Sequence, residues 1–135
     1  MSASVVNVTV LACRRSGCIA MRELNSQGTV ADLHTTLIEV PCGCAIDEPV
    51  MMKALEKGTD AVLALVCYEG SCQSLVGNAA VAKRVGVVRE VLKEIAVDRP
   101  VELCEVSAAS AVRCREALEQ IAARVREKRQ GGSPG

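Results

Sequence analysis

A short apolar run that ends in two closely spaced cysteines constrains the fold of this chain more than any other feature. The run covers residues 61–66, Cys67 follows it directly, and Cys72 comes after a Glu69-Gly70-Ser71 turn. An apolar run of this length between turn residues is typical of a strand buried on both faces, as in the centre of a parallel sheet. We therefore expect Cys67 at the carboxyl end of a central strand, where open α/β sheets bind their ligands.

Three further segments have strand-like composition, and segments with helical spacing separate the four strands. The expected strands span residues 5–12, 36–40, 61–66 and 101–106. The expected helices lie near residues 19–24, between Asp47 and Gly58, from about Asn78, and after Ser110. The third helix has the clearest pattern, because apolar residues recur along one face at Val81, Val85, Val88, Leu92 and Ile95.

The alternation of strands and helices predicts a parallel sheet with helices on both faces. The first and third expected strands are almost entirely apolar, whereas the second carries Glu39 and the fourth carries Glu102 and Glu105. We therefore expect the first and third strands at the centre of the sheet and the other two at its edges. Right-handed crossovers then predict a small doubly wound α/β sheet of four strands with the flavodoxin-like order 2-1-3-4.

Composition excludes several classes of partner. The chain has 16 basic and 16 acidic residues, so its net charge offers no attraction to nucleic acid or to an anionic membrane. Tyr68 is the only aromatic residue, which leaves almost nothing for bases to stack on. The apolar runs are far shorter than the ~20 residues that span a bilayer, and no secretion signal is evident. We expect a soluble cytoplasmic protein with one domain, residues 1–129, and a disordered tail, residues 130–135.

Eight cysteines in a cytoplasmic domain require an explanation other than the disulfide framework of small secreted proteins. Cys13, Cys42 and Cys67 each follow the end of an expected strand, so the expected sheet order brings all three to one edge. Because neighbouring strands lie about 4.8 Å apart, these thiols can converge with Cys72 on a small inorganic centre. Four thiolates suit either zinc or an iron–sulfur cluster, and their spacing leaves both open.

The other four cysteines fit such a centre less directly. Cys104 lies inside an expected strand and Cys114 lies on an apolar helical stripe, so we expect both in the hydrophobic core. Cys18 and Cys44 closely follow two of the strand-end cysteines. Each of these two could be a metal ligand, a reserve thiol or a packing residue.

Three functions stay open on the residues alone. The first is electron transfer by an iron–sulfur cluster, and the second is a four-cysteine structural zinc module that mediates complex assembly. The third is thiol-based redox chemistry by Cys67 or Cys72 at the start of a helix. The single histidine, His34, excludes a Rieske cluster, which needs two. No Walker A or dinucleotide-binding motif follows the first strand, so nucleotide binding has no support.

Four stretches of the chain carry a resemblance to a known family. They are Val10-Leu-Ala-Cys13, Ile38-Glu-Val-Pro-Cys42-Gly43, Cys67-Tyr-Glu-Gly-Ser-Cys72 and Gly77-Asn78-Ala-Ala-Val-Ala-Lys-Arg-Val85. From about Val5 to Lys128 the sequence resembles the delta, or iron–sulfur, subunit of the methyl-viologen-reducing hydrogenase. Members of that family work beside heterodisulfide reductase in methanogens, and relatives occur in similar bacterial complexes.

The resemblance implies a cofactor and its ligands. It implies a [2Fe-2S] cluster bound by Cys13, Cys42, Cys67 and Cys72. Many relatives have another cysteine three positions after the first, where this chain has Ser16. Cys18 follows two positions later, so Cys18 or Cys44 is a candidate substitute ligand.

The resemblance also implies a function and partners. It implies a subunit that passes single electrons from a hydrogenase or formate dehydrogenase module to a heterodisulfide-reductase-like flavoprotein. The sequence has no signal of a substrate pocket, so we expect a non-catalytic subunit of an oxidoreductase complex. We expect neither nucleic-acid binding nor membrane insertion.

Overall fold

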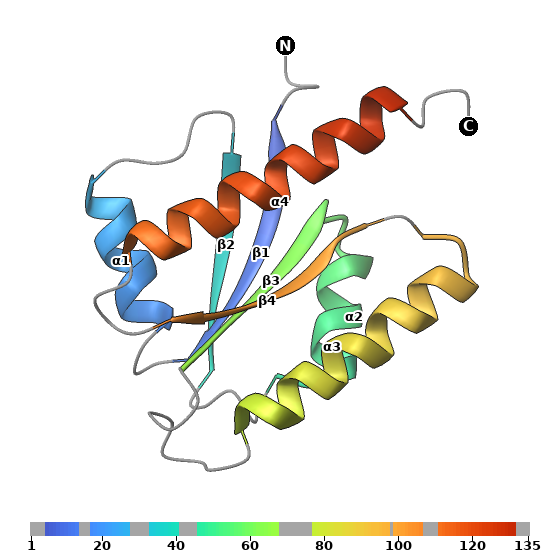
Figure 1. Ribbon diagram of the computed structural model, residues 1–135, viewed down its shortest axis with the longest axis horizontal. Helices are drawn as coiled ribbons and strands as arrows, with labels where there is room; N and C mark the ends of the chain where they lie inside the picture. The colour runs from blue at the N-terminus through green and yellow to red at the C-terminus, as the bar shows by residue number, and fades with distance from the viewer. Residues whose placement is uncertain are drawn as a thin grey trace.

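The computed structural model describes residues 5–13, 17–27, 33–40, 46–67, 77–97, 99–106 and 111–131. Strands and helices alternate along these residues (Figure 1). The strands are β1 (Val6–Cys13), β2 (Leu33–Val40), β3 (Ala61–Cys67) and β4 (Val101–Val106). The helices are α1 (Gly17–Gln27), α2 (Glu48–Glu56), α3 (Gly77–Glu94) and α4 (Ala111–Gly131).

All strand pairs in the sheet are parallel, and the strand order is β2-β1-β3-β4. This result confirms the expected order, with the two most apolar strands at the centre. Residues 61–66 of β3 are all buried, because helices cover both faces of this strand. β2 instead alternates between half-buried and exposed residues along most of its length, as a half-covered edge strand does.

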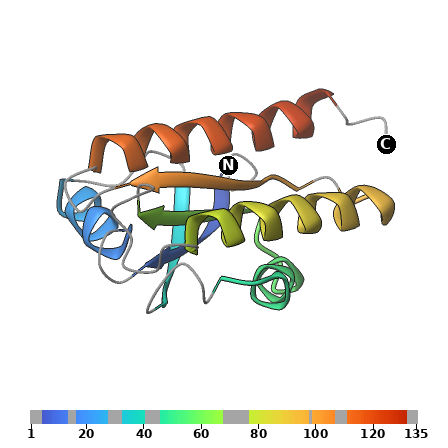
Figure 2. The same ribbon diagram turned by 60° about the horizontal axis from the view of Figure 1, so that its bottom comes forward.

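The core has two layers, one on each face of the sheet (Figure 2). On one face, α1 and α4 pack against alternate residues of β1 and β3, including Val10 and Leu63. On the other face, α2 and α3 pack against the intervening residues, including Leu11 and Val62. Successive side chains of a strand point to opposite faces, so an uninterrupted apolar strand can supply both layers at once.

Several boundaries differ from the expected ones, mostly where tertiary contacts outweigh the local pattern. β2 begins at Leu33 rather than residue 36, because it pairs with β1 along its whole length. α1 is longer than expected, and α4 continues to Gly131, so residues 130 and 131 of the expected tail are helical. Ile95 was expected on the buried face of α3, but it follows the end of this helix and is 56% exposed.

The start of α2 follows the expected capping chemistry. Asp47 has extended backbone angles, and its carboxylate accepts a hydrogen bond from the Val50 N–H at 3.1 Å. Pro49 lies in the first turn of α2. A backbone N–H at this position has no acceptor within the helix, so proline, which lacks the N–H, removes no helical hydrogen bond. Gly58 follows the last turn with φ of 94°, a conformation that glycine adopts without strain.

Among the described residues, no helix has both the length and the apolar character needed to cross a bilayer.

Replacing Asp47 with alanine is expected to lower the free energy of unfolding by about 1 kcal/mol. The substitution leaves the Val50 N–H without its acceptor at the start of α2. Urea unfolding followed by circular dichroism measures the change, with Asp47→Asn as the control because asparagine also caps helices. Equal stability of wild type and Asp47→Ala would show that water replaces the cap at no cost.

Candidate functional site

The four strands end together at one edge of the sheet, and two of the candidate ligands are the last residues of the central strands. Cys13 ends β1 and is paired in register with Val40, the last residue of β2. Cys67 ends β3 and is paired with Val106, the last residue of β4. Figure 1 shows this common carboxyl edge. The strand-end positions expected for Cys13 and Cys67 are therefore the positions that the backbone adopts.

The register between the central strands shows how close these two positions are. Ala12 is paired with Leu65, so Cys13 lies one residue beyond that pair and Cys67 lies two residues beyond it. Neighbouring strands are about 4.8 Å apart, so the backbones of Cys13 and Cys67 lie close together at this edge, and convergence of their thiolates on one centre stays a prediction. Cys42, Cys44 and Cys72 lie outside the described residues, so their expected places at this edge stay predictions.

The helices add a favourable electrostatic field at the same edge. Each helix follows the carboxyl end of a strand, so α1 and α3 begin there, at Gly17 and Gly77. The N-terminus of a helix carries a partial positive charge, which favours thiolates over neutral thiols close to it. The carboxyl edge therefore suits the anionic ligands that the sequence predicts.

Cys18 is part of the hydrophobic core. Its side chain is completely buried in the layer between the sheet and the helices α1 and α4. Its thiol donates a hydrogen bond to the Ala12 carbonyl, with 3.3 Å between the sulfur and the oxygen. These contacts favour a packing role, and a ligand role for Cys18 stays a prediction.

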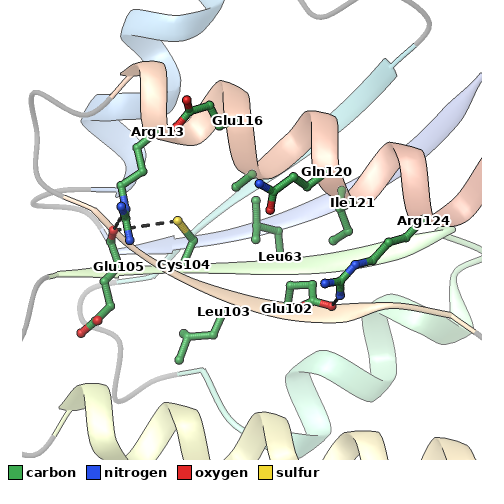
Figure 3. Close-up of a pocket in the computed structure, with 11 residues that line it drawn as sticks. Leu63, Glu102, Leu103, Cys104, Glu105, Arg113, Glu116, Gln120, Ile121 and Arg124 are labelled. Atoms are coloured by element: carbon green, nitrogen blue, oxygen red, sulfur yellow. Dashed lines mark hydrogen bonds and ion pairs between the residues drawn. The ribbon is translucent and has the colours of Figure 1, made fainter.

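Cys104 and Cys114 were both expected in the core, and their outcomes differ. Cys114 is fully buried on the apolar stripe of α4, which confirms the expectation. Cys104 is only half-buried, because β4 is an edge strand, and it lines a cavity of about 360 Å³ between β4 and α4 (Figure 3). Among the described residues, no three histidine, cysteine or acidic side chains are grouped closely enough to hold a metal ion.

Burial keeps both of these thiols protonated. It raises the pKa of Cys104, although the Arg113 guanidinium beside this thiol partly offsets the effect. Burial raises the pKa of Cys114 to about 11, and the negative charge that Cys104 acquires on ionisation contributes to this rise. A thiol with a raised pKa is a poor nucleophile at neutral pH, so neither residue has the properties of a reactive cysteine.

Raising the pH from 9 to 11 is expected to destabilise wild type more than Cys114→Ala. The pKa of Cys114 is about 11 in the fold against an ordinary 9.0, so the unfolded chain loses this proton first. The folded state then binds more protons, and the free energy of unfolding falls by at most about 1.4 kcal/mol per pH unit from this group. Urea unfolding at several pH values measures both slopes, and equal slopes would contradict the raised pKa.

Nearly the whole chain matches one known protein family. The family described as "Methyl-viologen-reducing hydrogenase, delta subunit" matches residues 8–128, from the first strand to the last helix. The chain belongs to this family. The resemblance inferred from the cysteine motifs is therefore confirmed.

Two archaeal hydrogenase subunits are among the relatives of this delta-subunit family member. The iron–sulfur subunit of the F420-non-reducing hydrogenase vhu of Methanocaldococcus jannaschii is 30% identical over 91 residues, 66% of this chain and 67% of that protein. Its counterpart in Methanococcus voltae is 31% identical over 92 residues, 67% of this chain and 68% of that protein.

A different kind of relative is a much larger protein. The ferredoxin:CoB-CoM heterodisulfide reductase of Methanosarcina mazei has one polypeptide that is 34% identical to this chain over 62 residues. These residues are 46% of this chain but only 8% of that polypeptide. A segment similar to part of this delta-subunit family member is thus built into a heterodisulfide reductase polypeptide.

One group of residues at the edge of the sheet was not singled out by sequence reasoning. Arg89 comes from α3, whereas Arg113 and Arg124 come from α4, yet all three reach β4. No local pattern marks such residues, because arginine is equally common on solvent-exposed helix faces. None of the three is a candidate ligand of the proposed centre.

Proposed function

We propose that this delta-subunit family member is an electron-transfer protein that carries a [2Fe-2S] cluster bound by Cys13, Cys42, Cys67 and Cys72. The observation that supports this proposal most directly is the position of Cys13 and Cys67 at the adjoining ends of the two central strands. Two relatives with about 30% identity are named iron–sulfur subunits, which is consistent with the same cofactor here.

The residues at the carboxyl edge fit this cofactor. Four thiolates are the usual ligand set of a [2Fe-2S] cluster, which supplies one-electron oxidation and reduction when bound. The two central strands hold the backbone of Cys13 and Cys67 in a rigid sheet, and the helix N-termini stabilise negative charge beside them. The buried apolar residues of β1 and β3 below the edge keep water away from one side of such a centre.

We further propose that the partners are a heterodisulfide-reductase-like flavoprotein on one side and a hydrogenase or formate dehydrogenase subunit on the other. The match within a heterodisulfide reductase polypeptide supports the first partner, because domains that interact as separate chains also occur fused.

We also propose that the protein is located in the cytoplasm. Cys104 and Cys114 are free thiols, as is usual in a reducing compartment.

Anaerobic purification followed by iron, sulfide and zinc analysis tests the cofactor. We expect about two irons and two sulfides per chain and visible absorption bands that dithionite bleaches. One equivalent of zinc in a colourless protein would instead indicate a structural module for complex assembly. Absence of metal even after reconstitution with iron and sulfide would contradict the proposal and favour thiol-based chemistry.

Electron transfer itself needs a separate test. Dithionite-reduced protein is mixed anaerobically with an oxidised heterodisulfide-reductase-type flavoprotein, and the return of visible absorbance is followed by stopped flow. We expect rapid reoxidation with one electron released per chain. A reduced protein that keeps its electron in the presence of this flavoprotein would contradict the proposed acceptor.

A further inference from the structure

The outer edge of β4 presents backbone groups that no neighbouring strand of the described sheet covers. β4 is the last strand in the order β2-β1-β3-β4. The Val62 N–H donates to the Pro100 carbonyl at 3.0 Å, which fixes the register of the parallel pair. In such a pair alternate residues face the partner strand, so the N–H and C=O groups of Val101, Leu103 and Glu105 point away from the sheet.

Two arginines cover part of this edge, one from each side of the sheet. Arg89 of α3 donates from Nε to the Val101 carbonyl at 2.8 Å. Arg113 of α4 donates from Nε to the Glu105 carbonyl at 2.6 Å. Among the described residues, no side chain donates to the outward-facing backbone of Leu103, which lies between them.

A groove follows the same edge. One cavity, of about 360 Å³, lies between residues 102–105 of β4 and the α4 helix (Figure 3). A second cavity, of about 280 Å³, lies between residues 99–102 and the end of α3. Both cavities are lined by Glu102 and Arg124, so they adjoin at this ion pair, and the two together are here named the β4 groove. An extended polypeptide is the ligand shape that matches a groove beside an open strand edge.

The β4 groove carries an excess of positive charge. Its cationic side chains are Arg89, Lys93, Arg99, Arg113 and Arg124. Its carboxylates are Glu102, Glu105 and Glu116. Glu102 pairs with both Arg89 and Arg124, so a single carboxylate serves two guanidinium groups. The excess lies near residues 99–102, where Arg89, Lys93, Arg99 and Arg124 line the cavity with Glu102 as its one described carboxylate, so an acidic ligand is favoured at that end.

A second copy of this chain fits the groove less well than an acidic partner. Two β4 edges paired about Leu103 would bring two cation-rich grooves together, and like charges across paired strands are destabilising. Arginine side chains over an edge strand also discourage unspecific pairing between identical molecules. An acidic partner instead gains ion pairs in the same place.

We propose that the outer edge of β4 binds an extended acidic segment of a partner polypeptide as a fifth strand of the sheet. Leu103 donates and accepts the first backbone hydrogen bonds. Arg89 and Arg113 then leave the carbonyls of Val101 and Glu105 and pair with carboxylates of the incoming segment. None of these residues is a proposed cluster ligand, so peptide binding at this edge is measured separately from electron transfer.

A labelled acidic peptide tests this proposal on the full-length protein as purified. The probe has about seven residues, alternates glutamate and valine, and is followed by fluorescence anisotropy. We expect saturable binding that weakens at high salt, and slower hydrogen exchange at the amides of residues 101 and 103 but not 102 and 104. Absence of binding to the wild-type protein would overturn the proposal.

Variants separate strand addition from simple charge attraction. Leu103→Pro removes an outward N–H that β3 does not use, and we expect binding to weaken about tenfold. Arg113→Glu is expected to weaken it by a similar factor, about tenfold. Arg22→Glu is the matched control, because Arg22 also pairs with a strand glutamate, Glu39, but at the opposite edge. We expect this control to bind the peptide as wild type does.

Two modified peptides complete the test even if Leu103→Pro does not fold. The first peptide has alternate amides N-methylated, and we expect it not to bind, because it cannot form the backbone hydrogen bonds of a strand. The second has lysine in place of glutamate, and we expect it not to bind either. Equal affinity for either modified peptide would overturn the proposal. Sedimentation that shows wild-type dimers, lost in Arg113→Glu, would also overturn it, because a second copy would then occupy the edge.

Discussion

Cys67→Ser is expected to lose nearly all of its bound iron and visible absorbance when it is purified anaerobically beside wild type. Cys67 ends the most buried strand of the sheet and adjoins Cys13, so in the proposed centre both belong to the same ligand set. Serine has nearly the same shape, but its hydroxyl is not ionised at neutral pH and is a much poorer ligand for iron. Iron and sulfide analysis and the visible spectrum measure the loss.

The matched controls for this experiment are the two cysteines of the β4 and α4 region. Cys104→Ser and Cys114→Ala remove thiols that are not proposed ligands and that stay protonated because burial raises their pKa. Both controls are expected to keep their iron, and Cys13→Ser is expected to behave as Cys67→Ser does. Full iron content in Cys67→Ser would remove this residue from the ligand set and favour Cys18 or Cys44 in its place.

Leu118→Ala is expected to lower the free energy of unfolding by about 3 kcal/mol. The Leu118 side chain is 1% exposed and packs in the layer that α1 and α4 form over the sheet. Alanine is the best helix former, so the substitution leaves a cavity without weakening α4 by propensity. Urea unfolding followed by circular dichroism under argon measures the loss.

The control for this substitution lies on the same helix. Val112 is 68% exposed, so Val112→Ala is expected to change the free energy of unfolding by less than about 0.5 kcal/mol. A similar effect of both substitutions would mean that the packing of α4 against the sheet contributes little to stability. In that case the two-layer core would depend mainly on α1, α2 and α3.

The strand order and the places of two candidate ligands could be predicted from residue chemistry alone. An uninterrupted apolar run belongs at the centre of a sheet with helices on both faces, and glutamates belong at its edges, so β3 and β4 took their expected places. Cys13 and Cys67 are adjacent in sequence to such runs, and parallel strands bring their carboxyl ends to one edge. The strand order and these two positions could be inferred because each depends only on the residue types that adjoin it along the chain.

Other features were decided by the tertiary structure. The start of β2 depends on its pairing with β1, and the exposure of Ile95 and Cys104 depends on where α3 ends and on what covers β4. The arginines at the edge of β4 come from helices on opposite faces of the sheet, and no local pattern relates them to the carbonyls they contact. Contacts between residues distant in sequence form only after the helices pack. The β4 groove therefore could not be predicted from the sequence.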